Sequence, residues 1–247
     1  MSQATSQTST AIRVVESALR EFGGGAVVVT SFQREGVVIA DMVLKAAPRT
    51  PVVTLETGRL PAATFDMIRL IEQRYGIAVE RVRPDAAEVA SMVESQGPDL
   101  FRDSYAQRIL CCQVRKVRPL AKRLEGVVAF FAGLRRSQSE SRAEIEVVDR
   151  SSSPVKICPL ADWSAEDVLR YTKENGLPEH PLYAAGYTSI GCDPCTRAVA
   201  TGEDERAGRW WWETDEAKEC GLHFTPDGKV ERTVDVLLRE ILERASV

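Results

Sequence analysis

The sequence lacks several features that would mark a membrane protein or a nucleic-acid-binding protein. Its 247 residues contain no run of about 20 apolar residues, which a membrane-spanning helix needs. The first ten residues, MSQATSQTST, have no basic segment followed by an apolar run, so we expect a disordered tail at 1–10 and no signal peptide. A net charge of -4 gives no general attraction to nucleic acid or anionic membranes. Together these absences favour a cytoplasmic protein.

Cysteine and histidine are scarce, and their positions are uneven. The chain has six cysteines and two histidines. In a reducing compartment, cysteines are more often free, metal-bound or catalytic than paired in disulfides. Half of the cysteines, three of the four tryptophans and one histidine lie in residues 191–224. This concentration indicates that 191–224 is a functional segment.

The rest of the chain alternates between apolar runs bounded by turn residues and stretches of helical periodicity. The pattern predicts strands at 26–30, 52–55, 78–82 and 127–131, short strands near 145–148 and 155–157, and helices at 11–22, 37–46, 62–75, 86–94, 104–124 and 164–175. Such alternation predicts an α/β fold with a mostly parallel sheet and helices on both faces. Because we find no repeat, low-complexity run or linker, we expect one domain over 1–247, ending in an amphipathic helix at 230–245.

Two pairs of cysteines are candidate metal ligands. Cys111 and Cys112 are adjacent on a predicted helix, so their side chains diverge by roughly 100°. Cys192 and Cys195 form a Cys-x-x-Cys turn. Four thiolates from two segments suit a tetrahedral zinc or a cubane iron–sulfur cluster, and the diverging pair favours the larger cluster. The alternative is that Cys111 and Cys112 are small buried core residues.

Cys220 belongs to neither pair. A nucleophilic thiolate needs nearby positive charge to lower its pKa. Glu219 opposes such a shift, and His223 is the one nearby group that would favour it. From the residues alone, Cys220 is either a catalytic thiol or an incidental one.

Basic residues and turn residues follow several of the predicted strands. Arg135 and Arg136 come after the strand at 127–131, in a Gly-Leu-Arg-Arg-x-Gln-Ser stretch that resembles a phosphate-binding loop. The carboxyl ends of parallel strands form the edge at which α/β folds bind ligands. The other candidate anion-binding residues are Ser31, Thr57, Gly58, Arg59, Lys116, Arg206 and Arg209. The alternative is that the arginines are solvated surface charges.

Eight motifs together resemble the iron–sulfur branch of the thiol-dependent sulfonucleotide reductases, the adenylylsulfate (APS) reductases. They are SFQRE (31–35), LETGRL (55–60), CCQVRKVRPL (111–120), GLRRSQSESR (133–142), PLADWSAEDV (159–168), YTSIGCDPCTRAV (187–199), GEDERAGRWWW (202–212) and ECGLHF (219–224). The resemblance implies an adenine-nucleotide α-hydrolase-like fold, related to the PP-loop enzymes. It also implies an oxidoreductase of sulfate assimilation and cysteine biosynthesis.

The resemblance further implies roles for individual residues. Cys111, Cys112, Cys192 and Cys195 would hold a [4Fe–4S] cluster. Cys220 would attack the sulfur of APS and expel AMP, and thioredoxin or glutaredoxin would then release sulfite from the S-sulfocysteine. The implied substrate contacts are Lys116, Arg206, Arg209 and His223 for the phosphosulfate, and Arg135 and Arg136 for the nucleotide.

The sequence also departs from the family pattern. The first loop reads Ser-Phe-Gln-Arg-Glu-Gly where many members have Ser-Gly-Ala-Glu-Asp, and Cys158 stands where relatives commonly carry asparagine. We interpret Cys158 as a buried spectator. No fused thioredoxin-like domain follows the motifs, so we expect a separate reductant, and the C-terminal helix could form a contact in a homo-oligomer.

Three other functions compete with APS reduction. The first is reduction of the 3′-phosphorylated substrate (PAPS), or of both substrates, although the PAPS-specific branch lacks the paired cysteines. The second is tRNA thiolation, which would require a Ser-Gly-Gly-x-Asp-Ser loop and a basic RNA surface. The third is a non-catalytic zinc-binding interaction module.

Overall fold

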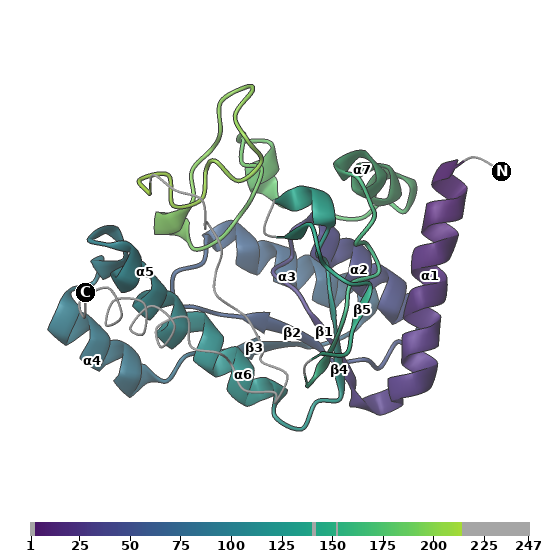
Figure 1. Ribbon diagram of the computed structural model, residues 1–247, viewed down its shortest axis with the longest axis horizontal. Helices are drawn as coiled ribbons and strands as arrows, with labels where there is room; N and C mark the ends of the chain where they lie inside the picture. Colours follow the sequence, from purple (N-terminus) through teal and green to yellow (C-terminus); the bar gives the residue numbers. More distant parts are fainter. Residues whose placement is uncertain (1–2, 140–141, 152, 214–247) are drawn as a thin grey trace, which may run out of the picture.

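The computed structural model describes residues 3–139, 142–151 and 153–213, and its centre is a six-stranded sheet (Figure 1). The strand order is β3-β2-β1-β4-β6-β5. Neighbouring strands run parallel except β5, which is antiparallel to β6 at the edge. The strands are β1 (Ala26–Val29), β2 (Val52–Leu55), β3 (Val79–Val82), β4 (Ala129–Ala132), β5 (Val148–Asp149) and β6 (Val155–Ile157).

Helices cover both faces of this sheet. They are α1 (Gln3–Phe22), α2 (Arg34–Ala46), α3 (Ala62–Tyr75), α4 (Ala86–Gln96), α5 (Tyr105–Cys112), α6 (Arg118–Leu124) and α7 (Ala165–Glu174). Short 3-10 turns lie at Gly23–Gly25, Leu100–Arg102, Arg136–Gln138, Pro181–Tyr183 and Asp193–Cys195. Figure 1 shows α4, α5 and α6 on one side of the sheet and α1, α2, α3 and α7 on the other.

Alternation along the strands explains the two layers. Successive residues of a strand face opposite sides of a sheet. In β1, Val28 belongs to the core that includes residues of α1, α2, α3 and α7, whereas Val27 packs in the core that contains Leu120 and Leu124 of α6. Because both faces of the sheet are buried at its centre, β1, β2 and β4 are apolar at nearly every position, whereas β3, β5 and β6 carry charged residues. The prediction of a mostly parallel sheet covered on both faces is confirmed.

The N-terminal segment differs from the prediction. Helix α1 begins at Gln3, so the disordered tail expected at 1–10 is wrong over residues 3–10. These residues have no apolar period, but Ala11, Val15 and Ala18 are buried in the core and anchor the following turns. The Thr10 hydroxyl donates to the Ser6 carbonyl oxygen (2.9 Å) within the helix. Tertiary packing of the later turns therefore stabilises a helix that begins at Gln3, whereas the sequence pattern predicts that it begins at residue 11.

The helix predicted at 104–124 forms, but it is not regular. A π-helical turn at Gln113–Val117 separates α5 from α6, directly after Cys111 and Cys112. A π turn inserts one residue into the helical repeat and often lies at a functional site. It therefore changes the direction in which Lys116 points relative to a regular helix.

Strand order places a ligand-binding crevice at the middle of the sheet. From β1 the chain passes to β2 on one side, whereas β4 pairs with β1 on the other side. In open α/β sheets, ligands bind beyond the carboxyl ends of the strands at such a reversal. Within the described residues, no helix is long and apolar enough to span a membrane. The predicted helix at 230–245 lies outside the described residues.

Candidate active site

A cavity of about 670 Å³ lies beyond the carboxyl ends of β1, β2 and β4. Its lining includes Thr30 and Ser31 after β1, Thr57 after β2, and Gly133 and Leu134 after β4. Typical small-molecule sites measure about 300–1,000 Å³, so the cavity is large enough for a nucleotide. It lies where the strand order predicts a ligand.

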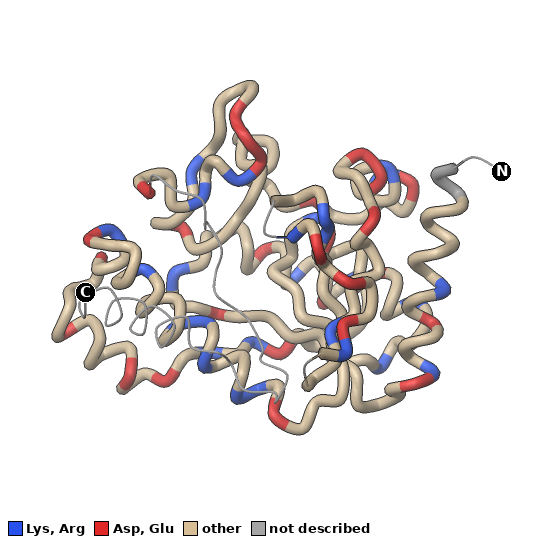
Figure 2. The backbone as a smooth tube through the Cα atoms, in the orientation of Figure 1, with Lys and Arg blue, Asp and Glu red and all other residues tan. Residues whose placement is uncertain are grey.

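Several of the predicted substrate-binding residues meet in this cavity. Those that line it are Ser31, Thr57, Lys116, Arg206 and Arg209, together with the cluster candidate Cys192. Figure 2 shows basic and acidic residues intermixed over the molecule. An anion is therefore attracted by local groups of cations, such as those that line this cavity, and not by one extended basic surface. The sequence-distant Lys116 and Arg209 both lie near the cysteines, where they favour the charged form of the Cys195 thiol.

Arg209 is held in place by its neighbours. It is buried, and its guanidinium group lies against Gly191, where a Cβ atom would come within 2.4 Å of Nη2. The Arg209 Cζ atom lies 4.6 Å from the centre of the Trp210 ring, and Nη1 donates to the Ser189 hydroxyl at 3.4 Å. A guanidinium fixed in this way is a preorganised donor for an anion.

Two other predicted contacts do not reach the cavity. Arg59 borders a separate hollow of about 530 Å³, where it forms an ion pair with Asp99 at 3.0 Å. Gly58 adopts a φ of +74°, and its preceding neighbour Thr57 accepts a hydrogen bond from Arg115 Nη1 through its carbonyl oxygen (2.9 Å). Glycine at 58 therefore supplies the left-handed turn that directs the Thr57 side chain into the site.

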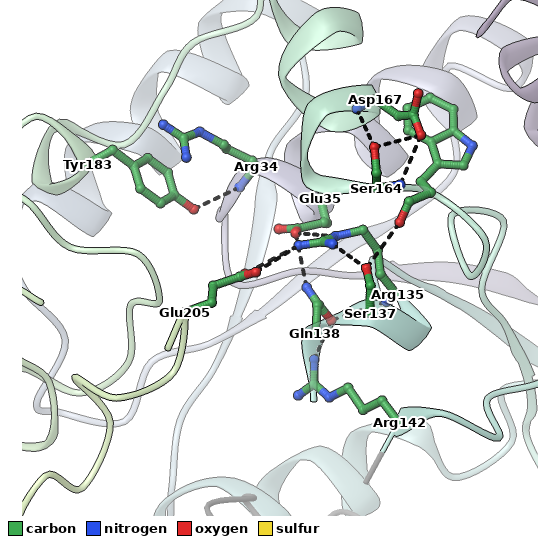
Figure 3. Close-up of polar contacts among 11 residues, drawn as sticks. Arg34, Glu35, Arg135, Ser137, Gln138, Arg142, Ser164, Asp167, Tyr183 and Glu205 are labelled. Atoms are coloured by element: carbon green, nitrogen blue, oxygen red, sulfur yellow. Dashed lines mark hydrogen bonds and ion pairs between the residues drawn. The ribbon is translucent and has the colours of Figure 1, made fainter. Parts of the chain in front are cut away.

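Arg135 and Arg136, predicted as nucleotide contacts, are both engaged by protein groups. Arg135 is 2% exposed and forms an ion pair with Glu35 (2.8 Å), as drawn in Figure 3. Its Nη2 atom lies 3.3 Å from Glu205, whose pKa is raised by burial despite the opposing charge of Arg135. Arg136 pairs with Asp162 and donates to the Ile145 carbonyl oxygen. Neither side chain borders the cavity.

The four paired cysteines are brought into one buried cluster. Cys111, Cys112, Cys192 and Cys195 are 5–7% exposed and pack with Trp210. The Cys192 sulfur lies 3.3 Å from the Thr57 hydroxyl oxygen. Burial raises the pKa of Cys111, and it raises the pKa of Cys195 to about 12. Two segments separated by some eighty residues thus bring four thiols into one buried cluster, of which Cys192 also lines the cavity.

The surroundings of these thiols fit a negatively charged iron–sulfur group. Among the described residues, no three histidine, cysteine, aspartate or glutamate side chains converge closely enough to hold a single metal ion. Arg115 and Lys116 nevertheless lower the pKa of Cys111, against the effect of burial. Buried N–H groups without a hydrogen-bond partner include Gln113 Nε2, Arg115 Nε, Arg209 Nε and Trp210 Nε1. Such donors are costly unless an acceptor occupies the site, and cluster sulfur is an acceptor.

Comparison with known proteins agrees with this arrangement. Residues 25–198 match the model of the phosphoadenosine phosphosulfate reductase domain. The chain belongs to this family. The adenosine 5′-phosphosulfate reductase of Allochromatium vinosum is 43% identical over 215 residues, which cover 86% of this chain and 84% of that protein. The protein of the same name from Agrobacterium fabrum is 46% identical over 203 residues, covering 81% and 78%.

Solved structures of other proteins have the same fold as this chain. Phosphoadenylyl-sulfate reductase from Candida auris aligns with a TM-score of 0.65 and 27% identity, covering 77% of this chain and 90% of that one. Yeast FAD synthetase aligns with a TM-score of 0.53 at 15% identity, covering 80% and 69%, and shares the fold alone. The predicted family and the adenine-nucleotide α-hydrolase-like fold are confirmed.

Sequence reasoning missed several residues that border the cavity. Glu35, Gln138 and Arg142 lie within motifs that the sequence did single out, and Glu205 directly precedes Arg206. The available sequence signal was their position within a few residues of an arginine in the same motif. Gln33 also lines the cavity, and its amide oxygen accepts a hydrogen bond from the Ile190 backbone (2.7 Å). No sequence signal indicates that contact.

Cys158 is completely buried, in agreement with its interpretation as a spectator. It lies among apolar residues between the sheet and α6, and burial raises its pKa to about 11. It does not border the cavity. Cys220 and His223, the remaining predicted site residues, lie outside the described residues.

Gly133 is expected to tolerate no side chain. A Cβ atom there would lie 2.6 Å from the Glu35 carbonyl carbon and 2.7 Å from the Gly36 nitrogen. Gly133→Ala should therefore separate the β4 loop from α2 and lower the free energy of unfolding by about 2 kcal/mol, measured by urea denaturation. Gly24→Ala is the control, because no atom lies within 4 Å of its Cβ position. Equal stability of the two variants would contradict this expectation.

Proposed function

We propose that this protein reduces adenylylsulfate to sulfite and AMP, using Cys220 as nucleophile and an external dithiol as reductant. The observation that carries the proposal is that Lys116, Arg206 and Arg209 line the same cavity as Cys192. A phosphosulfate needs cations of this kind, and the named relatives from Allochromatium vinosum and Agrobacterium fabrum are adenosine 5′-phosphosulfate reductases.

The cavity residues have distinct tasks in this reaction. Arg209 and Lys116 donate to the phosphosulfate and balance the charge that develops on the AMP phosphate as it leaves. The Thr57 and Ser31 hydroxyl groups, which follow β2 and β1, are additional donors or acceptors in the same cavity. The apolar side chains of Val29, Leu55 and Phe130 line the cavity nearer the sheet and suit the adenine ring.

Covalent chemistry is assigned to Cys220. Its thiolate forms a bond to the sulfur of APS, and the bond between that sulfur and the phosphate oxygen breaks, with the electron pair leaving on AMP. A thiolate of thioredoxin or glutaredoxin then attacks the Cys220 sulfur. Sulfite leaves with the electron pair of the S–S bond, and a second thiol of the reductant resolves the mixed disulfide.

The four clustered cysteines would hold a [4Fe–4S] group. When bound, this group supplies structural cross-linking of α5 to the 192–195 turn and a fixed charge next to the substrate. Arg115 and Lys116 balance that charge from the protein side, which explains two cations beside buried thiols. A cytoplasmic location and a separate reductant protein complete the proposal.

Mass spectrometry of the anaerobically purified protein tests the proposal. The reduced protein is incubated with APS in the absence of thioredoxin, and we expect a sulfonate adduct on Cys220 that thioredoxin discharges as sulfite. An adduct formed with PAPS and not with APS would show that the substrate is the 3′-phosphorylated compound. Absence of an adduct with either substrate, on protein shown to contain iron and acid-labile sulfide, would refute the proposed reaction.

A further inference from the structure

Two buried arginines hold the ends of the segment that carries Arg206 and Arg209. Arg135 contacts Glu205 at the start of this segment, and Arg108 contacts Glu213 at its end. Arg135 is 2% exposed and Arg108 is fully buried. We call residues 205–213 the cation segment. At each end, a glutamate of the segment forms an ion pair with a buried arginine of the protein body.

Arg135 joins three parts of the chain, as Figure 3 shows. Its Nε atom donates to Glu35 in the first turn of α2 (2.8 Å), and its Nη1 atom donates to the Ser137 hydroxyl (2.7 Å). Its Nη2 atom contacts both carboxylate oxygens of Glu205 at 3.3 Å. All three guanidinium nitrogens therefore have protein partners, and Arg135 connects the cation segment to the sheet.

Neighbouring contacts reinforce the Arg135 end. Gln138 Nε2 also donates to Glu35 (3.0 Å), and the Thr188 hydroxyl donates to the Glu205 carbonyl oxygen (2.6 Å). Glu35 and Glu205 themselves border the cavity. The negative charge of Glu205 is thus paired with Arg135 at the cavity, next to the neighbouring cation Arg206.

Arg108 holds the other end from α5. Its Nε atom lies 2.6 Å from Glu213 Oε1, and its Cζ atom lies 4.3 Å from the centre of the Trp210 ring. Arg209 stacks on the same ring, at 4.6 Å. The indole of Trp210 is therefore in contact with one arginine that holds the segment and one arginine that lines the cavity.

The cation segment has no helix or strand to hold it. It forms two turns, in which Arg209 N donates to the Arg206 carbonyl oxygen and Glu213 N to the Trp210 carbonyl oxygen (both 2.9 Å). Backbone hydrogen bonds to residues 195–197, around an isolated bridge between Thr196 and Arg209, join it to the preceding stretch. Trp210 has a φ of +43°, a conformation that non-glycine residues rarely adopt. A segment in such a conformation persists only where its surroundings fix it.

We propose that Arg135 and Arg108 are positioning residues, whose ion pairs with Glu205 and Glu213 hold Arg206 and Arg209 against the cavity. A buried guanidinium left without its carboxylate is costly, so each buried arginine favours the arrangement that keeps its glutamate in place. The arginines that bind substrate are thereby separated from the arginines that set their position. The kinetic part of this inference rests on the proposed function.

Glu205→Gln is the variant of choice, because it removes one charge while Arg135 keeps Glu35 as its partner. Glu203→Gln is the matched control, since Glu203 belongs to the same stretch but pairs with the partly exposed Arg197 (2.8 Å). Two measurements are made on protein of equal iron content. They are backbone hydrogen exchange of the peptide spanning 202–213, and KM and kcat for APS.

In Glu205→Gln we expect faster hydrogen exchange than in wild type, confined to this peptide. In the control we expect the exchange rate of wild type. We also expect KM for APS to rise about tenfold with kcat changed less than about twofold, because lost positioning weakens binding of substrate and transition state alike. Glu213→Gln should act in the same way from the other end. Unchanged exchange in Glu205→Gln, or faster exchange with an unchanged KM, would overturn the inference. Failure of the wild-type protein to act on APS would instead refute the proposed function, and the exchange measurement would still decide whether Glu205 holds the segment.

Discussion

Cys220→Ser is expected to release no sulfite from APS while still binding it. Serine keeps the size of the side chain but lacks a thiol of low enough pKa to act as the nucleophile, so neither the S-sulfo intermediate nor the reductant's exchange step can form. We expect turnover to fall by at least about a thousandfold, as when a covalent nucleophile is removed from other enzymes. The measurement is sulfite release with thioredoxin present, combined with equilibrium binding of APS.

Cys158→Ala is the matched control for this experiment. Cys158 is also a thiol, but it is fully buried and its pKa is raised to about 11 by burial, so it is not a nucleophile at neutral pH. Loss of one buried sulfur should cost stability without affecting sulfite release. Normal turnover in Cys220→Ser, or loss of turnover in Cys158→Ala at full folding, would contradict the assigned role of Cys220.

Cys195→Ser is expected to purify with little iron and little activity. Cys195 is buried with the other three cysteines, and its backbone N–H donates to the Cys192 carbonyl oxygen (2.9 Å) in a tight turn. Serine in its place supplies a hard oxygen ligand instead of a soft thiolate, which iron–sulfur clusters prefer. Iron and acid-labile sulfide should fall well below about four of each per chain, together with the visible absorption of the cluster.

Loss of the cluster should also loosen the structure around it. The cavity wall at Cys192 and the packing of Trp210 share the same buried group of side chains. We therefore expect the Cys195→Ser protein to unfold at lower urea concentration than wild type, whereas Cys158→Ala keeps its full iron content. A Cys195→Ser protein with four irons, or a wild-type protein containing zinc and no iron, would contradict the assignment of the four cysteines.

Side chains of the first loop, Ser-Phe-Gln-Arg-Glu-Gly, contact several distant segments. Gln33 accepts a hydrogen bond from the Ile190 backbone, and Arg34 pairs with Glu179 while its Cζ atom lies 3.7 Å from the centre of the Tyr183 ring. Glu35 pairs with Arg135. Three consecutive side chains thus attach the loop to segments that surround the cavity. Anion binding by Ser31, at the start of this loop, stays a prediction.

Several features of this protein could be predicted from the sequence by itself. Apolar runs such as Ala26–Val29 and the helical spacing of Ala62–Tyr75 identified most elements of the sheet and its covering helices, because burial on both faces forces those patterns. The Cys-x-x-Cys turn and the adjacent pair at Cys111 also identified the four clustered thiols. Residue chemistry and local periodicity are sufficient for such features, since each is encoded within a short stretch.

Tertiary structure alone decided which arginines face the cavity. Arg135 and Arg209 both lie in arginine-rich motifs, yet Arg135 is enclosed by Glu35 and Glu205 while Arg209 lies on the cavity wall. The difference depends on carboxylates that are 100 and 70 residues away from Arg135 in the sequence. The length of α1 was likewise set by packing on the core. A guanidinium group has the same chemistry in both positions, and only its neighbours in space determine whether it lines the cavity or holds the protein together.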